Sequence, residues 1–94
     1  MPEGYVPTEE SILAAFEKLF KPGEPGVRRF QPSGVRYVNL SGGAILVEQN
    51  PNKRSQWAML ARQEHRIAWV MRDGEYLARV VDGAVQMLGK AQES

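Results

Sequence analysis

The sequence predicts an α+β fold in which an N-terminal amphipathic helix packs on an antiparallel β-meander of about five strands. Apolar residues recur at helical spacing from Ile12 to Phe20. Further along the chain, Asp73-Gly74 and Asp82-Gly83 separate three β-rich segments. Asp-Gly tolerates the positive backbone dihedrals of a two-residue hairpin turn, so these pairs predict a meander. A short helix near residues 55–63 is expected to be inserted before it.

The N-terminal helix is predicted from about Glu9 to Phe20. Its apolar residues, at i, i+1, i+4, i+7 and i+8 from Ile12, form one stripe. Thr8 can cap the helix, and the acidic residues of its first turn complement the helix dipole. Lys21-Pro22-Gly23 ends it.

A short strand and a hairpin are predicted next. Val27 to Phe30 can form a short edge strand, limited by prolines on both sides. Residues 35–49 are typical of a hairpin with the loop Ser41-Gly42-Gly43. A three-residue loop pairs Val38 with Leu46 and sets Arg36 opposite Glu48, a favourable match of charges. A two-residue loop remains an alternative.

Residues 55–63 favour a helix over a strand. They contain strong helix formers and no β-branched residue, and Ser55 is a good N-cap. In the alternative strand, Trp57, Met59 and Ala61 would share one face.

Two-residue loops at both Asp-Gly pairs fix the expected register of the meander. Arg72 faces Glu75, Trp69 faces Ala78, and Val80 faces Val85. This register creates one wholly apolar face, which we expect to form the core. That face comprises Ile67, Trp69, Met71, Tyr76, Ala78, Val80, Val85 and Met87.

Length and composition limit the function classes. The chain of 94 residues is expected to form a single domain over 1–94, with flexible ends at 1–8 and 89–94. It has no cysteine, one histidine and a net charge of +1. These counts exclude thiolate chemistry and iron–sulfur clusters, and disfavour a histone-like polyanion binder. We expect no cofactor, no metal and no membrane span, and a cytoplasmic protein.

A catalytic site is not expected. His65 is the sole imidazole base, and both aspartates occupy hairpin turns, where Asp serves the backbone. We expect His65 to be a solvent-facing loop or helix-capping residue. A small enzyme built around His65 is the third-ranked function class.

The first-ranked class is a non-catalytic module that binds a protein partner or a second copy of itself. The predicted non-core face of the meander mixes arginines with aliphatic residues, a composition typical of interfaces. The expected interface residues are Val70, Leu77, Arg79, Val81 and Leu88.

The alternative is a nucleic-acid-binding domain. Lys53 and Arg54 precede a predicted helix start, where exposed backbone N–H groups attract anions, and Trp57 can stack on a base. A solvated loop followed by a core tryptophan explains the same residues structurally. The expected nucleic-acid contacts are Lys53, Arg54, Trp57, Arg66, Arg72 and Arg79.

Overall fold

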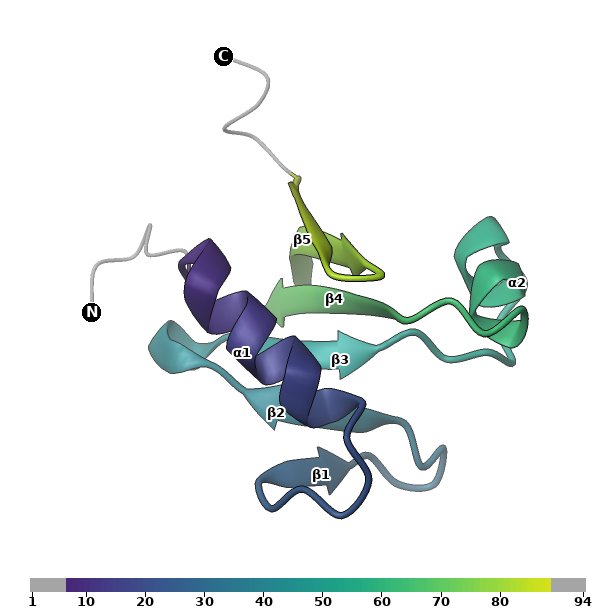
Figure 1. Ribbon diagram of the computed structural model, residues 1–94, viewed down its shortest axis with the longest axis horizontal. Coiled ribbons are helices and arrows are strands. Elements are labelled where there is room, and N and C mark those ends of the chain that lie inside the picture. The colour runs from purple at the N-terminus through teal and green to yellow at the C-terminus, as the bar shows by residue number, and fades with distance from the viewer. Residues whose placement is uncertain (1–6, 89–94) are drawn as a thin grey trace.

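The computed structural model describes residues 7–88 as one antiparallel sheet with two helices (Figure 1). The helices are α1 (Glu9–Leu19) and α2 (Gln56–Arg62). The strands are β1 (Val27–Arg29), β2 (Arg36–Asn39), β3 (Ile45–Glu48), β4 (Ile67–Arg72), β5 (Glu75–Val81) and β6 (Ala84–Met87). The predicted α+β class and the inserted helix are therefore confirmed, and residues 55–63 are not a strand.

The six strands follow one another across the sheet in chain order, and each pairs antiparallel with the next. The strand count is six rather than about five, because the short segment β1 pairs with β2 despite its flanking prolines. None of the helices within residues 7–88 has the length and hydrophobicity that crossing a bilayer requires. The expectation of flexible ends falls mostly outside the described residues; of those that are described, Pro7 is buried and Thr8 caps α1.

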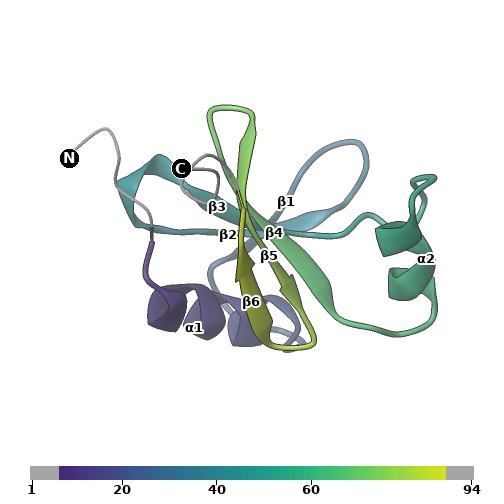
Figure 2. The ribbon, with the colours of Figure 1, turned by 90° about the horizontal axis from the view of Figure 1, so that it is seen from above.

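Helix α1 covers one face of the sheet (Figure 2). The Thr8 side chain accepts a hydrogen bond from the Ser11 N–H at 3.1 Å, which satisfies a donor of the first turn. The helix ends one residue earlier than predicted, with Phe20 as its C-cap. Its apolar stripe forms the core with the inward side chains of β2 to β5. The main members of this core are Ile12, Phe16, Leu19, Val38, Leu46, Ala68, Val70, Ala78 and Val80.

The β2–β3 hairpin has the predicted three-residue loop. Val38 pairs with Leu46, and the Leu40 N–H donates to the Ala44 carbonyl at 2.9 Å. The Arg36 guanidinium contacts Glu48 at 2.9 Å, as the cross-strand match of charges predicts. This hydrogen bond raises the pKa of Arg36.

A β-bulge changes the predicted register of the β4–β5 hairpin. The turn itself is as expected, with Arg72 opposite Glu75 and Met71 opposite Tyr76. Beyond it the pairing shifts, so that Ala78 lies opposite Val70 and not opposite Trp69. Leu77 is therefore an extra residue on β5, and an extra residue reverses the faces that follow.

The predicted core face of the meander is consequently wrong in part. Ala78 and Val80 do belong to the core beneath α1, joined by Ala68 and Val70 of β4. The residues Ile67, Trp69, Met71 and Tyr76 lie on the opposite face. That second face of the sheet is the one that α1 leaves uncovered.

Candidate binding groove on the uncovered sheet face

One row of side chains crosses the uncovered face from edge to edge. Direct cross-strand partners share a face of a sheet. The partners that form this row, from β1 to β6, are Arg28, Tyr37, Val47, Trp69, Arg79 and Gln86. The row places two aromatic residues and two arginines on strands that are far apart in the sequence.

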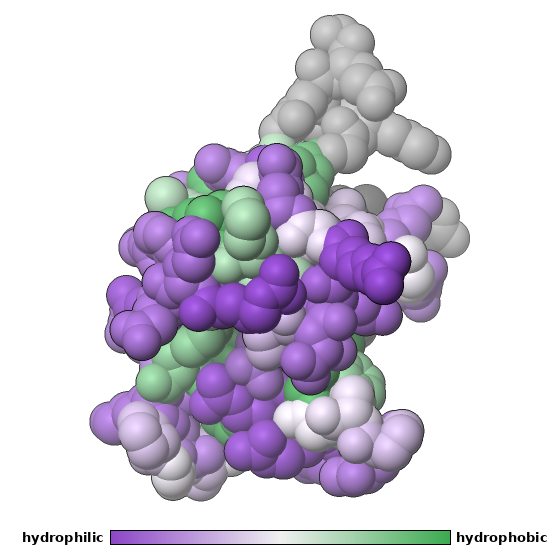
Figure 3. Space-filling model, turned by 90° about the vertical axis from the view of Figure 1, so that its right-hand side faces the viewer, coloured by the Kyte–Doolittle hydropathy of each residue, from purple (hydrophilic) through white to green (hydrophobic). Residues whose placement is uncertain are grey.

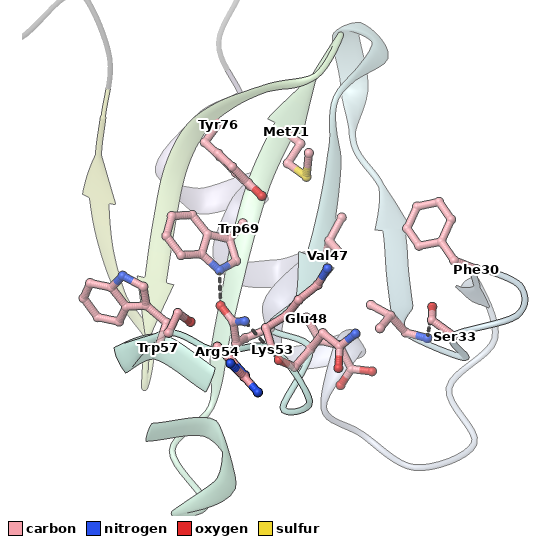
Figure 4. Close-up of a pocket in the computed structure, with 14 residues that line it drawn as sticks. Phe30, Ser33, Val47, Glu48, Lys53, Arg54, Trp57, Trp69, Met71 and Tyr76 are labelled. Atoms are coloured by element: carbon pink, nitrogen blue, oxygen red, sulfur yellow. Dashed lines mark hydrogen bonds between the residues drawn. The ribbon is translucent and has the colours of Figure 1, made fainter. Parts of the chain in front are cut away.

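Five aromatic residues lie in or beside this row, in two clusters that flank Val47 (Figure 4). We call the surface that they form the aromatic face: Phe30, Tyr37, Trp57, Trp69 and Tyr76. Phe30 stacks on Tyr37 with ring centroids 4.2 Å apart, and Trp69 contacts Tyr76 at 4.8 Å. Trp57 of α2 meets Trp69 edge-on at 6.1 Å. Five of the chain's eight aromatic residues thus gather here, and Tyr76 is 54% exposed.

Arg79 joins α2 to the sheet. Its guanidinium lies 4.0 Å from the Trp57 ring centroid and 5.5 Å from that of Trp69, within the range of a cation–π contact. Its Nε donates to Gln86 at 2.8 Å, which fixes the guanidinium from the neighbouring strand. Helix α2 is also held by buried Ala58, whose N–H donates to the Ser55 cap at 3.1 Å.

A groove of about 650 Å³ runs across this face. Phe30 stands on one side of it, Trp69 and Tyr76 stand on the other, and Val47 lies between them (Figure 4). Met71 lies toward one end of the groove in this view. The volume of the groove falls within the range of small-ligand sites, and the walls of the groove are mostly apolar, as in such sites.

Two cations lie at the other end of the groove. Lys53 and Arg54 are exposed in the loop before α2, and within residues 7–88 neither takes part in an ion pair. Arg62 of α2 donates to the carbonyls of Pro51 and Lys53, at 2.5 and 3.3 Å, and so shapes this loop. The acidic residue of the lining, Glu48, is already bound to Arg36. The end of the groove near α2 is therefore electropositive.

The predicted protein-interface residues do not share one surface. Val70 is fully buried, and Leu77 packs against the same core. Arg79 and Val81 pair with Trp69 and Ile67 and so lie on the opposite face. Leu88 is half-buried just beyond β6. The bulge at Leu77 explains why these residues lie on different faces, because the prediction assumed an uninterrupted strand.

The predicted nucleic-acid residues divide into two groups. Lys53, Arg54 and Trp57 line the groove, and Arg79 stacks on Trp57 at its margin. Arg66 lies on the α1 side, 5.3 Å from the Phe16 ring centroid, so it is not part of the groove. Arg72 lies opposite Glu75 next to the β4–β5 turn.

The sequence did not indicate Val47 and Phe30 as groove residues or Tyr37 as part of the aromatic face, and Tyr76 was predicted in the core. Tyr37 and Val47 alternate with Val38 and Leu46, so their face was readable once the hairpin register was known. Tyr76 could not be placed without the bulge.

His65 is partly exposed, with 45% of its side chain accessible, and contacts Asp82 at 2.7 Å. The other carboxylate oxygen of Asp82 accepts the Arg66 N–H at 2.8 Å. The hydrogen bond with His65, helped by that from Arg66, lowers the pKa of Asp82. Asp82 thus links the start of β4 to the β5–β6 turn, in addition to forming that turn with φ +51°.

No protein-family model, curated protein or solved structure matches this chain. Its function is therefore argued from the groove itself. In residues 7–88 no group of three or more His, Cys, Asp or Glu side chains is placed to hold a metal ion.

Proposed function

We propose that this protein is a non-catalytic binding module that holds single-stranded nucleic acid in the groove of its aromatic face. Bases stack on Trp69, Tyr76 and Phe30, and phosphates lie at Lys53 and Arg54. The supporting observation is the juxtaposition in one groove of aromatic rings, of which Phe30 and Tyr76 are exposed, with two cations that form no ion pair within residues 7–88. Aromatic platforms combined with a basic margin are how proteins hold single strands.

We rank nucleic-acid binding above a protein interface, the reverse of the order that the sequence suggests for these two classes. The protein-interface class depended on four aliphatic residues on an exposed sheet face, and Val70 and Leu77 instead serve the core. The face that stays uncovered is aromatic and carries cations at one end. The net charge of +1 limits electrostatic attraction to this end, so we expect modest affinity that weakens with salt.

Intrinsic fluorescence provides a direct assay, because both tryptophans of the chain line the groove. Titration with a single-stranded oligonucleotide at low salt should change the emission. Tyr76→Ala should weaken binding by about 5- to 160-fold, since stacking one base contributes roughly 1–3 kcal/mol. Tyr76 is exposed, so this change should leave the fold intact.

The cation contribution is tested through the salt dependence of binding. Lys53→Gln with Arg54→Gln should make the slope of log affinity against log salt shallower by about 1.4, because each contact with a single strand contributes about 0.7. Lys18→Gln, which removes one positive charge from an exposed position of α1, should leave the slope unchanged, whereas each single variant at Lys53 or Arg54 should change it by about 0.7. An unchanged slope in the double variant, or no binding to any strand at low salt, would refute the proposal.

A protein partner remains the second candidate, because Tyr76 and Met59 are large hydrophobic residues that are 54% and 46% exposed. Aromatic residues, Met and Arg are enriched in protein interfaces. Hydrophilic residues cover most of the molecule's α2 end, with separate smaller apolar patches, so a broad apolar interface is not present there (Figure 3). Sedimentation of the wild type beside Tyr76→Glu tests self-association: concentration-dependent dimers lost in the variant would favour this candidate.

A further inference from the structure

We propose that the groove binds single strands without preference for the identity of the base, because the amide, serine and carboxylate oxygens of its lining already accept hydrogen bonds inside the protein. This inference rests on the proposed function and names its substrate class more narrowly. It follows from the hydrogen bonds of the polar residues that line the groove.

The amide of Gln49 is engaged at both ends. Its Oε1 accepts from the Trp69 indole Nε1 at 2.7 Å, and its Nε2 donates to the Asn50 carbonyl at 3.0 Å. The Asn50 side-chain oxygen in turn accepts the Asn52 N–H at 2.8 Å. These two amides would otherwise be the natural readers of base edges, since an amide can pair with a base on both its donor and its acceptor side.

The serine and carboxylate acceptors of the lining are engaged in the same way. Ser33 Oγ accepts the Val35 N–H, and Ser55 Oγ caps α2. Both carboxylate oxygens of Glu48 bind Arg36, through its backbone N–H and its guanidinium, each at 2.9 Å. A bound base thus meets acceptors that each already hold an internal hydrogen bond.

The groups left over are the hydroxyl of Tyr76 and the cations Lys53 and Arg54. The hydroxyl both donates and accepts, so it can pair with a donor or an acceptor on any base. The two cations contact phosphates in the proposed complex, and phosphates carry no information on the base. The amino groups that distinguish adenine and cytosine from thymine need acceptors. Stacking on Trp69, Tyr76 and Phe30 adds little selectivity, since each base has a π-face. The affinity therefore comes from stacking of bases on the aromatic rings and from contacts of phosphates with the two cations.

The bond between Trp69 and Gln49 offers a way to create selectivity. Trp69→Phe keeps an aromatic ring in place but removes the donor, which frees Gln49 Oε1 to accept from a base amino group. This variant should favour adenine and cytosine strands over thymine strands by about 3- to 10-fold. Met87→Ala, which changes an exposed side chain of β6 away from the groove lining, serves as the control.

The test measures the anisotropy of labelled DNA strands of about ten nucleotides, a length within the site size of small single-strand binders. The strands are all-thymine, all-cytosine and all-adenine, with an abasic strand that has the same number of phosphates. Wild-type dissociation constants should agree within about threefold among the three bases, and the abasic strand should bind at least about tenfold more weakly.

The outcomes separate the two proposals. A preference of tenfold or more for one base overturns base-independent binding while leaving nucleic-acid binding intact. A Trp69→Phe variant that stays indifferent to base identity overturns its proposed cause, the engagement of Gln49 Oε1 by Trp69. An abasic strand that binds as tightly as the others shows that the aromatic face is not used, which overturns both. Absence of binding to all four strands at low salt also overturns both.

Discussion

Val70→Thr tests the face of β4 that forms the core. Val70 is fully buried beneath α1, in the cluster that contains Leu46 and Ala78. The two side chains have nearly the same shape, so the substitution exchanges one buried methyl group for a hydroxyl. An uninterrupted β4–β5 register would instead place Val70 on an exposed face, where the same exchange should have little effect.

The expected cost follows from the burial of this side chain. Loss of one methyl group from the core removes about 0.8 kcal/mol of hydrophobic stabilisation. Burial of a hydroxyl group adds about 1–2 kcal/mol. The free energy of unfolding should therefore fall by about 2–3 kcal/mol. In urea, where small domains lose about 1–3 kcal/mol per molar, the midpoint should fall by about 1–2 M with an unchanged slope.

Val81→Thr is the matched control. Val81 lies on the opposite face, is only partly buried, and pairs with Ile67. Its substitution should lower the free energy of unfolding by less than about 1 kcal/mol. Equal midpoints for the two variants, or a larger loss for Val81→Thr, would show that the bulge and the core assigned to this sheet are wrong.

Three further predictions concern polar contacts. Glu48→Gln should lower stability by about 1 kcal/mol, because the half-buried guanidinium of Arg36 loses its counter-charge, and urea unfolding measures this loss. Asp82 has a lowered pKa in the folded protein, so its contribution to stability is fully present above its unfolded pKa of about 4 and is lost as the pH falls through its folded value. Asp82→Asn, which tolerates the same turn backbone, should therefore be less stable than wild type at pH 7. This gap should narrow as the pH falls below the unfolded pKa of about 4 and through the lowered folded pKa, and a gap that is constant with pH would contradict the role of the carboxylate. Ser55→Ala removes the cap of α2 and should cost about 0.5–2 kcal/mol, with faster amide exchange confined to that helix as the diagnostic observation.

Local signals predicted most of the fold correctly. The cap at Thr8, the turns at both Asp-Gly pairs and the pairing of Arg36 with Glu48 each depend on residues that are close in sequence or related by a short loop. The Ser55 cap and the helix formers after it settled the second helix in the same way.

The bulge at Leu77 could not be predicted, because β4 is apolar on both faces. Ala68 and Val70 would fill a core as readily as Trp69 and Met71, so alternation alone does not choose between them. The larger side chains were assigned to the core, whereas the small ones lie beneath α1. The location of the aromatic face depends on which side of β4 is buried beneath α1, which is why the candidate site was only partly predicted.

The bulge also has a consequence for the way this fold tolerates change over generations. A codon deletion that removes Leu77 would join Tyr76 directly to Ala78 and leave a regular ladder, in which Met71 with Tyr76 and Val70 with Ala78 keep their partners and their faces. A deletion of one residue between Ala78 and Val81 has no such outlet, because the residues beyond it would change face. In descendants of this chain, loss of the residue at the bulge should therefore be tolerated more readily than a change of length elsewhere in β5.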